Sequence, residues 1–263
     1  MKLFDLSGRS AIITGSSRGI GLAIARRLAE HGARVVISSR KADVCEAEAA
    51  RINSELGRDA AVAISASISS KPDLQRLVAE TNRRLGPVRI LVCNAATNPY
   101  YGPMAGIDDA QFRKILENNV IANHWLMQLV APQMIEGRDG AIVIVSSVAG
   151  LKGSGMIGAY GVSKAADMAL ARNLAVEWGP HNVRVNCIAP GLVKTDFARA
   201  LWEDPAILAG ETSGTPLRRI GMPDEIAGAA VFLASSAGSF VTGQTLVVDG
   251  GATVAWHSGG SKQ

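Results

Sequence analysis

A tyrosine and a lysine four positions apart, Tyr160 and Lys164, have the spacing that most directly suggests chemistry. In a helix, residues at i and i+4 share one face, so the phenol and the ammonium would lie side by side. A free tyrosine titrates near about 10, too high for easy proton transfer at neutral pH. A nearby cation stabilises the phenolate and lowers that pKa. The pair therefore predicts a general acid–base, although ordinary amphipathic helices also carry this spacing.

A glycine-rich turn, Thr-Gly-Ser-Ser-Arg-Gly-Ile-Gly, follows an apolar run at 10–14 that predicts a strand. Gly15 permits a tight turn, Gly19 lets the backbone approach a pyrophosphate, and Gly21 lets the next helix pack close to the sheet. The free N–H groups of that helix would face the phosphates. The turn therefore predicts a dinucleotide site whose contacts are Gly15, Ser17, Arg18, Gly19, Ile20 and Gly21.

The end of the second predicted strand indicates which dinucleotide is bound. Sites selective for NAD place an acidic residue there to hold the ribose 2′-hydroxyl. This chain has Ser39 and Arg40 at that place, with Arg18 in the glycine turn. Guanidinium groups pair with phosphate in a bidentate fork, so two arginines at one ribose favour the 2′-phosphate of NADP(H). The alternative is a pair of solvated surface arginines.

Apolar runs alternate with helical patterns along the whole chain, which favours a doubly wound α/β Rossmann fold with a parallel sheet and helices on both faces. Strands are expected at 10–14, 34–38, 60–65, 88–93, 141–146, 183–188 and 245–248. Helices are expected at 20–31, 43–56, 72–85, 109–135, 159–178 and 223–234, with a lid-like segment at 196–210. We expect one domain over residues 1–257 and a loose tail at 258–263.

Composition narrows the function classes. The chain has 263 residues, 48% of them hydrophobic, which is enough for a large core. Its three cysteines form no Cys/His cluster, so neither a disulfide framework nor a metal site is expected, and a reducing cytoplasm fits. No signal peptide or membrane span is evident. The net charge of +4 is scattered along the chain, so we expect no nucleic-acid partner.

Taken together, these motifs resemble the short-chain dehydrogenase/reductase family over roughly residues 3–251. Besides the glycine turn and the Tyr160/Lys164 pair, the resemblance rests on Asn94-Ala-Ala, Asn119, Ser147, Pro190-Gly-Leu-Val-Lys-Thr and the ending Thr242-Gly-Gln-Thr-Leu-Val-Val-Asp-Gly-Gly. The resemblance implies a seven-stranded parallel sheet and hydride transfer between a nicotinamide and a carbonyl or alcohol.

The resemblance also implies a role for each site residue. Tyr160 would be the general acid–base, and Lys164 would lower its pKa and bind the nicotinamide ribose. Ser147 would bind the substrate oxygen, and Asn119 would hold a water that relays protons. The remaining cofactor contacts would be Ser67, Ile68, Asn94, Ala95, Ala96, Pro190, Gly191, Val193 and Thr195.

Two of these positions depart from the family pattern. Ala96 stands where the family usually has glycine, and its methyl group would crowd the side of the site that holds the nicotinamide ribose. Ser67 stands where an aspartate often holds the adenine, although Ile68 could still pack on the ring. Contacts to the adenine are therefore less certain than contacts to the phosphates.

Within the family, the chain is most similar to NADPH-dependent carbonyl and retinal reductases. Its substrate pocket is expected to be lipophilic and to draw on Tyr100, Tyr101, Leu151, Met156, Leu192, Phe197 and Trp202. The chain ends Ser-Lys-Gln and lacks the terminal leucine of a peroxisomal tripeptide, so that address does not carry over. Family analogy suggests a homotetramer, built through the helices at 109–135 and 159–178 and through the last strand.

Two other functions stay open at this point. One is reduction of a 3-oxoacyl group on an acyl carrier protein, which needs basic residues for an acidic carrier. The segment 136–139, just before the fifth predicted strand, has only one cation, Arg138. Val176 stands at a position of the helix at 159–178 where such reductases tend to have a basic residue. The other is a non-catalytic NADP-binding scaffold or sensor. Such proteins usually lose the tyrosine or the lysine, and this chain keeps both.

Overall fold

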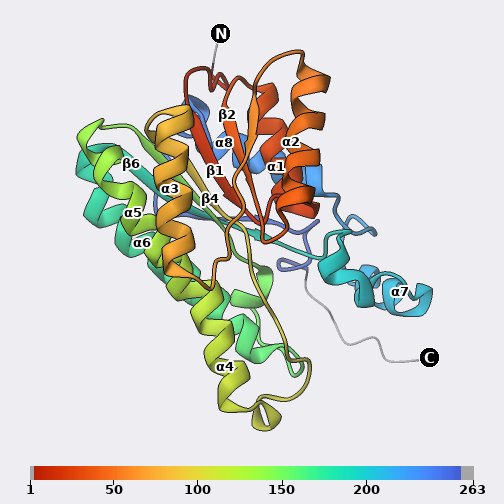
Figure 1. Cartoon of the computed structure of the whole chain (residues 1–263). Helices are drawn as coiled ribbons and strands as arrows, with labels where there is room; N and C mark the ends of the chain where they lie inside the picture. Colours follow the sequence, from red (N-terminus) through yellow and green to blue (C-terminus); the bar gives the residue numbers. More distant parts are fainter. Residues whose placement is uncertain (1–2, 256–263) are drawn as a thin grey trace, which may run out of the picture.

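The computed structural model describes residues 3–255, and the predicted tail at 258–263 lies outside them. Seven parallel strands form one sheet in the order β3-β2-β1-β4-β5-β6-β7 (Figure 1). The order reverses between β1 and β4, which is the switch point where ligands bind in such sheets. The strands are β1 Ser10–Thr14, β2 Arg34–Ser38, β3 Ala61–Ala63, β4 Val88–Cys93, β5 Gly140–Val145, β6 Val183–Pro190 and β7 Thr245–Val248. The predicted fold class is confirmed.

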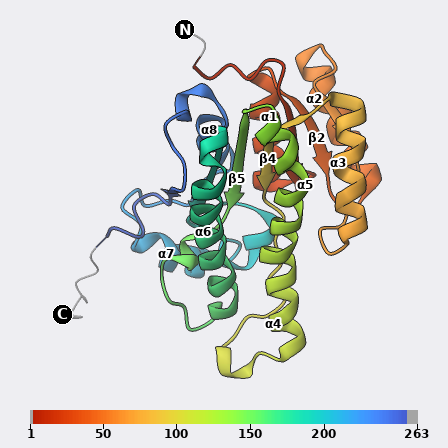
Figure 2. The same ribbon diagram turned by 90° about the vertical axis from the view of Figure 1, so that its left-hand side faces the viewer.

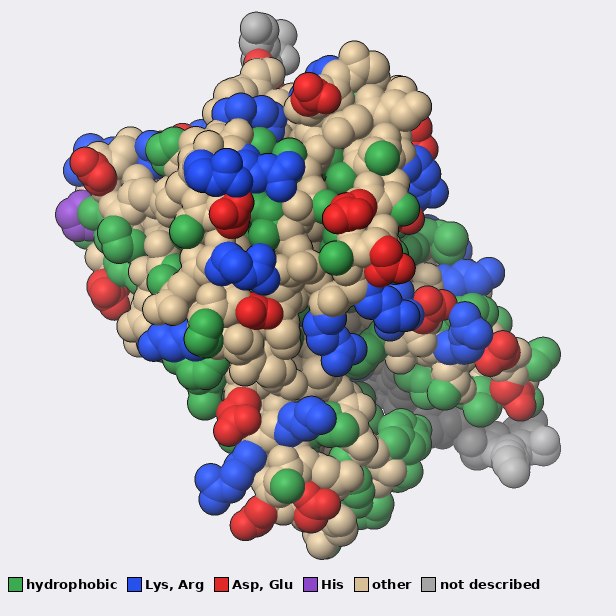
Figure 3. Space-filling view, in the orientation of Figure 1, with side chains coloured by type: hydrophobic (Ala, Val, Ile, Leu, Met, Phe, Trp, Pro, Cys, Tyr) green, Lys and Arg blue, Asp and Glu red, His purple; other side chains and the backbone are tan. Residues whose placement is uncertain are grey.

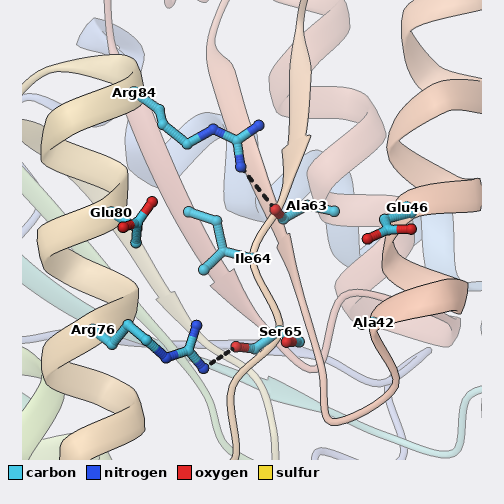
Figure 4. A pocket seen from close by; sticks show the side chains of 8 residues that line it. All are labelled: Ala42, Glu46, Ala63, Ile64, Ser65, Arg76, Glu80 and Arg84. Carbon is cyan, nitrogen blue, oxygen red and sulfur yellow. Dashed lines mark hydrogen bonds between the residues drawn. The ribbon is translucent and has the colours of Figure 1, made fainter.

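Strand β3 is shorter than the predicted 60–65 because it lies at the edge of the sheet and pairs only with β2. Beyond it, arginines of α3 take the backbone carbonyls that a neighbouring strand would otherwise use. Arg84 Nη1 donates to Ala63 O at 3.0 Å and Arg76 Nη2 donates to Ser65 O at 2.7 Å (Figure 4). They border a hollow of about 250 Å³ between α2 and α3. Charged side chains thus protect this edge from pairing with another chain.

Two layers of helices cover the sheet, one on each face (Figures 1 and 2). The core on one face includes residues of α1 Gly19–Glu30, α2 Ala42–Leu56 and α8 Pro223–Ala234. The core on the other face includes residues of α3 Lys71–Leu85, α5 Ala122–Glu136 and α6 Gly158–Trp178. Because both faces are buried, the central strands are apolar at nearly every position, as the sequence pattern indicates.

Helix ends follow the local sequence. Pro223 is the first residue of α8, as expected from its fixed backbone angle. Helix α6 ends at Trp178, and Gly179 and Pro180 begin a short 3-10 turn. Ser70 caps α3 by accepting from Asp73 N at 3.3 Å. These signals were sufficient to place most helix boundaries within two residues of the observed ones.

The single helix predicted over 109–135 is wrong in its middle. Helix α4, Asp109–Leu116, is joined to α5 by a π-helical turn at Glu117–Ile121. The wider turn carries two buried asparagines, and Asn118 Nδ2 donates to Thr97 Oγ1 at 3.2 Å. A π-turn inside a helix is uncommon and is frequent at functional sites. The polar contacts that stabilise it come from a loop about 20 residues away, which periodicity could not reveal.

Helices α4 and α7 project beyond the same end of the sheet (Figures 1 and 2). The lid-like segment predicted at 196–210 is a 3-10 helix, Asp196–Leu201, followed by α7, Pro205–Ser213. Asp204 caps α7 by accepting from Ala206 N at 2.7 Å. The segment is therefore ordered by its own capping chemistry and sits at the carboxyl ends of the strands.

The surface carries both signs of charge. On the face seen in Figure 3, lysines and arginines alternate with aspartates and glutamates, and no broad basic stripe crosses it. Several of these are ion pairs one helical turn apart, such as Arg83 with Glu80 at 2.6 Å on α3. Among residues 3–255, no helix has the length and apolar character needed to cross a membrane.

The cysteines are buried and free. Cys93 lies on β4 and Cys187 on β6, both inside the core. Burial raises the pKa of both thiols far above the ordinary value. They are therefore neutral, small core residues at physiological pH.

Candidate active site

Tyr160 and Lys164 lie in the first turns of α6, so the predicted i, i+4 geometry is present. The helix is held tightly against the segment that follows β5. An added Cβ at Gly150 would lie 2.7 Å from Ala165 N, and one at Gly161 would lie 2.6 Å from Ala149 O. Only glycines allow this approach. The sequence therefore brings the end of β5 and the start of α6 into direct backbone contact.

Lys164 is almost fully buried, with 1% exposure. Its Nζ donates to Val145 O at 2.9 Å and to Asp167 Oδ2 at 3.1 Å, and it lies 5.7 Å from the centroid of the Tyr160 ring. Burial opposes the charged ammonium, but Asp167 and Tyr160 outweigh it and raise the pKa of Lys164. A positive charge thus stands beside the phenol, as the spacing predicts.

Ser147 follows β5 and has an extended backbone. Its Oγ accepts from Ala149 N at 3.1 Å and so caps the 3-10 turn Val148–Gly150. This is the turn-stabilising contact that a lone serine at a strand end would make. A hydroxyl can accept and donate at once, so its proton stays available for a substrate oxygen. Structural and catalytic uses of Ser147 are therefore compatible.

Asn119 lies in the π-turn and is fully buried. Its Oδ1 accepts from Thr97 N at 2.8 Å, and its Nδ2 donates to Thr97 O and to Ser163 Oγ, both at 3.0 Å. The side chain thus joins the loop after β4 to α6. Its backbone carbonyl accepts from Asn123 Nδ2 at 2.6 Å. Both N–H donors of the Asn119 amide are therefore used, and a water at Asn119 would bind to one of its two oxygens as a donor.

The glycine turn has the geometry of a phosphate cradle. Gly15 and Gly19 have positive φ angles of 65° and 58°, which favour glycine. An added Cβ at Gly21 would lie 2.5 Å from Gly15 O, so α1 packs directly on the turn. Arg18 is the N-cap of α1 and makes no side-chain capping bond, unlike Ser70 at α3. The N-terminal N–H groups of α1 are left for an anion, which fits a dinucleotide pyrophosphate.

Asn94 supports this turn from β4. Its Nδ2 donates to Thr14 O at 2.9 Å and to Gly15 O at 3.2 Å. Thr14 Oγ1 in turn accepts from Asn94 N at 3.0 Å and Ala95 N at 3.1 Å. The amide of Asn94 therefore shapes the cradle from behind. Asn94 therefore positions the glycine turn through these hydrogen bonds, whether or not it also contacts the cofactor.

Ser16 is a positioning residue that the sequence reasoning missed. It is fully buried, donates from Oγ to Ile13 O at 2.7 Å, and accepts from Ser38 N at 2.8 Å. It thereby fastens the glycine turn to the end of β2. No signal in a Ser-Ser dipeptide distinguishes the inward serine, Ser16, from Ser17, which is partly exposed.

The predicted selectivity residues lie around the end of β2 and the start of α1. Ser39 Oγ lies 3.1 Å from Cys45 Sγ at the start of α2, and Arg40 is exposed. Arg18 Nη1 pairs with Asp196 Oδ2 at 3.2 Å, at the first residue of the lid segment. Arg18 is therefore bound to the lid segment, and its convergence with Arg40 on one ribose stays a prediction.

Ser67 and Ile68 lie in the loop between β3 and α3. Ser67 N donates to Asp73 Oδ2 at 2.9 Å, so an aspartate of α3 orders the loop. Ile68 is half-buried and packs against the core on the α5–α6 side of the sheet. Ala95 and Ala96 at the end of β4 are also half-buried.

The segment after β6 lies across the glycine turn. Pro190 ends β6, and an added Cβ at Gly191 would lie 2.9 Å from Asp249 Cα. Val193 is buried and bridges to Gly221. A Cβ at Gly19 would lie 3.5 Å from Thr195 Cγ2, so Thr195 stands over the N-terminus of α1. These four positions lie where the family resemblance places contacts to the nicotinamide half of the cofactor.

The predicted substrate pocket divides into two parts. Phe197 is 62% exposed, and its ring centroid lies 6.2 Å from that of Tyr160. Three other predicted pocket residues, Tyr101, Leu151 and Met156, are also exposed hydrophobic side chains. Met156 O accepts from Gly102 N at 2.8 Å, which joins two of the loops.

Two aromatic residues of the predicted pocket make contacts within their own segments. Tyr100 Oη donates to Pro103 O at 2.8 Å, and an added Cβ at Gly102 would lie 2.8 Å from Tyr100 Oη. Trp202 Nε1 donates to Thr195 O at 2.8 Å, and Lys194 Nζ lies 5.4 Å from its ring centroid. These two side chains therefore hold their loops, and Leu192 beside Val193 is half-buried.

Asp167 and Asn123 were not singled out by the sequence reasoning. Both are buried, and Asn123 Nδ2 donates to Asp167 Oδ1 at 3.1 Å. A signal for Asp167 existed, because an acidic residue three positions after Lys164 shares its helix face. Asn123 carries no such local signal, since it comes from a different helix 44 residues away.

Comparison with known proteins identifies the family of the chain. A family model described as "Enoyl-(Acyl carrier protein) reductase" matches residues 15–253. A rabbit (Oryctolagus cuniculus) protein, dehydrogenase/reductase SDR family member 4, is 43% identical over 94% of each chain. The structure of a Burkholderia cenocepacia gluconate 5-dehydrogenase in complex with NADP and tartrate aligns with a TM-score of 0.92 and 36% identity, over 97% of this chain and 99% of that one.

A structure of 7α-hydroxysteroid dehydrogenase complexed with NADH and a 7-oxo bile acid is also similar. It aligns with a TM-score of 0.88 and 40% identity, over 95% of this chain and 96% of that one. The family model covers most of the chain, and the solved relatives share its fold. The chain therefore belongs to the short-chain dehydrogenase/reductase family, whose members carry out nicotinamide-dependent oxidoreduction of alcohols and carbonyls.

Proposed function

We propose that the protein is an NADP(H)-dependent oxidoreductase that interconverts a lipophilic ketone or aldehyde and its alcohol. The observation that carries this proposal is the buried Lys164 ammonium, 5.7 Å from the centroid of the Tyr160 ring, with the exposed Phe197 ring 6.2 Å from the same tyrosine. An exposed aromatic beside a proton donor suits an apolar substrate. The human and rabbit relatives described as dehydrogenase/reductases support the reaction class.

The chain's own residues would handle the proton and the developing charge. The nicotinamide cofactor, when bound, supplies or accepts the hydride. During reduction, negative charge grows on the substrate oxygen, and Ser147 and Tyr160 would both donate hydrogen bonds to it. Tyr160 then transfers its proton to that oxygen, and Lys164 stabilises the phenolate left behind. In oxidation the same proton moves back to Tyr160.

A substrate screen tests the proposed function directly. NADPH oxidation would be followed with aromatic ketones, α-diketones, retinal, oxosteroids, acetoacetyl thioesters and oxo sugar acids, the last because solved relatives are described as gluconate dehydrogenases. We expect turnover with the apolar carbonyls and little with sugar acids. Preferential turnover of acetoacetyl thioesters would instead support an acyl-carrier-protein reductase. No oxidation across the panel would favour a non-catalytic NADP-binding protein.

Cofactor preference gives a separate prediction. Arg40 and Ser39 replace the acidic residue of an NAD site, so we expect NADP⁺ to bind more tightly than NAD⁺. Arg40→Ala should raise the Kd for NADP⁺ by about tenfold, because a hydrogen bond to a charged group is worth about 1.5–3 kcal/mol. The Kd for NAD⁺ should change little. Isothermal titration of both cofactors measures this, with the exposed Arg113→Ala on α4 as the matched control.

Equal or tighter binding of NAD⁺ by the unmodified protein would contradict the assignment.

Arg18 already has an acidic partner in the structure, because it is paired with Asp196. We propose that a ribose 2′-phosphate competes with Asp196 for the Arg18 guanidinium. Asp196→Asn is then expected to leave Arg18 free for the phosphate.

The protein is also proposed to be a cytoplasmic homotetramer. Three free, buried cysteines suit a reducing compartment. Val162 and Val176 leave apolar surface on α6 at 45% and 81% exposure, and Phe240 near β7 is fully exposed. These surfaces fit the two interfaces suggested by family analogy. Light scattering should give a mass near four times 27.4 kDa, and a monomer in dilute solution would contradict the proposal.

A further inference from the structure

A fully buried carboxylate, Asp167, contacts the Lys164 ammonium. Asp167 is 0% exposed and lies one helical turn after Lys164 on α6. Its Oδ2 accepts from Lys164 Nζ at 3.1 Å, and its Oδ1 accepts from Asn123 Nδ2 at 3.1 Å. A buried charge is costly unless it is paired and hydrogen-bonded. Both oxygens of Asp167 are held, so the carboxylate has a fixed orientation toward the ammonium.

Asn123 connects this ion pair to the π-turn. Its Nδ2 donates to Asn119 O at 2.6 Å as well as to Asp167. A chain of contacts therefore runs from Asn119 through Asn123 and Asp167 to Lys164. These residues come from two helices, α6 and the interrupted α4–α5, that pack on the same face of the sheet. The π-turn positions the carbonyl at one end of the chain, and α6 positions the ammonium at the other.

We propose that Asp167, oriented by Asn123, is a positioning residue that keeps the Lys164 ammonium in place and charged, and so sets the acidity of Tyr160. The proposal rests on the role of Lys164 in the proposed function and deepens it. Lys164 Nζ is fixed by Val145 O at the end of β5 and by Asp167. Two of its three N–H donors are thereby used, and one is left for a ribose hydroxyl of the cofactor.

The electrostatics of the pocket agree with this role. Burial alone lowers the pKa of a lysine, by up to about 3–5 units for a fully buried group. At Lys164 the carboxylate of Asp167 is the foremost influence acting against burial, and the pKa is raised. The other titratable groups acting on the pair are Tyr160 on α6, Cys187 on β6 and, for Asp167, Cys93 on β4. Both thiols are neutral, so Asp167 is the negative charge that balances the ammonium.

The tyrosine content of the chain allows a test without a substrate. There are three tyrosines, and two of them, Tyr100 and Tyr101, lie in the loop after β4. In a Tyr100→Phe/Tyr101→Phe background, ultraviolet phenolate absorbance follows Tyr160 alone as the pH is raised. Because no turnover is measured, the titration succeeds or fails independently of the substrate screen.

We expect Asp167→Asn in this background to raise the titration midpoint of Tyr160 by at least about one pH unit, a tenfold loss of acidity. Asparagine keeps the shape and can still accept from Lys164, but it removes the charge. Lys164→Met in the same background gives the reference titration midpoint of Tyr160 without a neighbouring cation. The midpoint measured for Asp167→Asn should move toward that reference value. An unchanged or lower midpoint would overturn the proposal, since Lys164 would then hold its charge unaided.

Two further variants separate positioning from general loss of stability. Asn123→Ala removes the group that orients Asp167 and should shift the midpoint in the same direction by a smaller amount. Thr81→Val on α3 removes a buried hydroxyl that donates to Leu77 O at 2.7 Å, away from the site. It should leave the Tyr160 midpoint unchanged. If Thr81→Val shifted the Tyr160 midpoint as much as Asp167→Asn does, the shift would reflect a general loss of stability, and the proposal would be overturned.

Discussion

Replacing Tyr160 by phenylalanine is expected to lower kcat by about 100-fold or more while NADPH binding stays nearly intact. The phenylalanine keeps the ring that packs beside Phe197, with ring centroids 6.2 Å apart in the native protein. Only the hydroxyl is lost, and with it the proton that the substrate oxygen must receive. The binding of the cofactor depends on the glycine turn and the segment after β6, which this change does not touch.

The measurement is steady-state NADPH oxidation with the best carbonyl of the screen, together with fluorescence titration of NADPH. Thr81→Val is the matched control, because it removes a buried hydroxyl that donates to Leu77 O at 2.7 Å on α3, away from the site. That control should leave kcat nearly unchanged. Turnover of Tyr160→Phe close to that of the unmodified enzyme would remove Tyr160 from the acid–base role.

Replacing Lys164 by methionine is expected to destabilise the fold as well as to abolish most activity. The side chain is 2% exposed and its partner Asp167 is 0% exposed. Removing one member of a buried ion pair leaves an uncompensated charge and costs about 3–5 kcal/mol. For a chain of this size, 1 kcal/mol moves Tm by roughly 2–4 °C, so a fall of about 6–20 °C is expected. Thermal unfolding followed by circular dichroism measures it.

The loss of stability in Lys164→Met should diminish toward acid pH. Burial raises the pKa of Asp167, and Lys164 and Asn123 act against that rise. Without Lys164, the pKa of Asp167 in the folded protein rises further above its value in the unfolded chain. The destabilisation should therefore be full above the folded pKa of Asp167 and should diminish as the pH falls through it. Tm of the variant relative to the native protein should accordingly recover toward acid pH.

A double variant separates the fold from the chemistry. Lys164→Met/Asp167→Leu replaces both buried charges by apolar groups, which is often neutral for stability. It should regain most of the lost Tm and none of the lost activity. If the single variant were as stable as the native protein, the buried ion pair would not contribute as the geometry indicates. If the double variant regained activity, Lys164 would have no part in the proton transfer.

Several features of the site could be predicted because they are encoded locally. The i, i+4 spacing of Tyr160 and Lys164 needs only a helix, and the apolar pattern around it supplied one. The glycines of the turn were identified by their place between a strand and a helix, and their positive φ angles follow from it. The parallel sheet with helices on both faces followed from the β-α alternation.

Other features depended on residues far apart in the chain. The π-turn in the predicted helix 109–135 exists because Asn118 and Asn119 bond to Thr97. The amide of Asn94, a predicted cofactor contact, also binds the carbonyls of the glycine turn. Arg18, predicted to bind the cofactor phosphate, also pairs with Asp196. In each case the partner is a polar group in another segment, and periodicity carries no information about it.

The sequence by itself determined the family, the sheet and the placing of Tyr160 and Lys164 on one helix, because these follow from short-range spacing and hydrophobic pattern. Only the tertiary structure decided how Lys164 is buried and charged. Val145 O, Asp167 and, behind it, Asn123 converge on that ammonium from β5, α6 and α5. A buried charge is governed by the groups that fold around it, and those groups become neighbours only when the sheet and its helices have assembled.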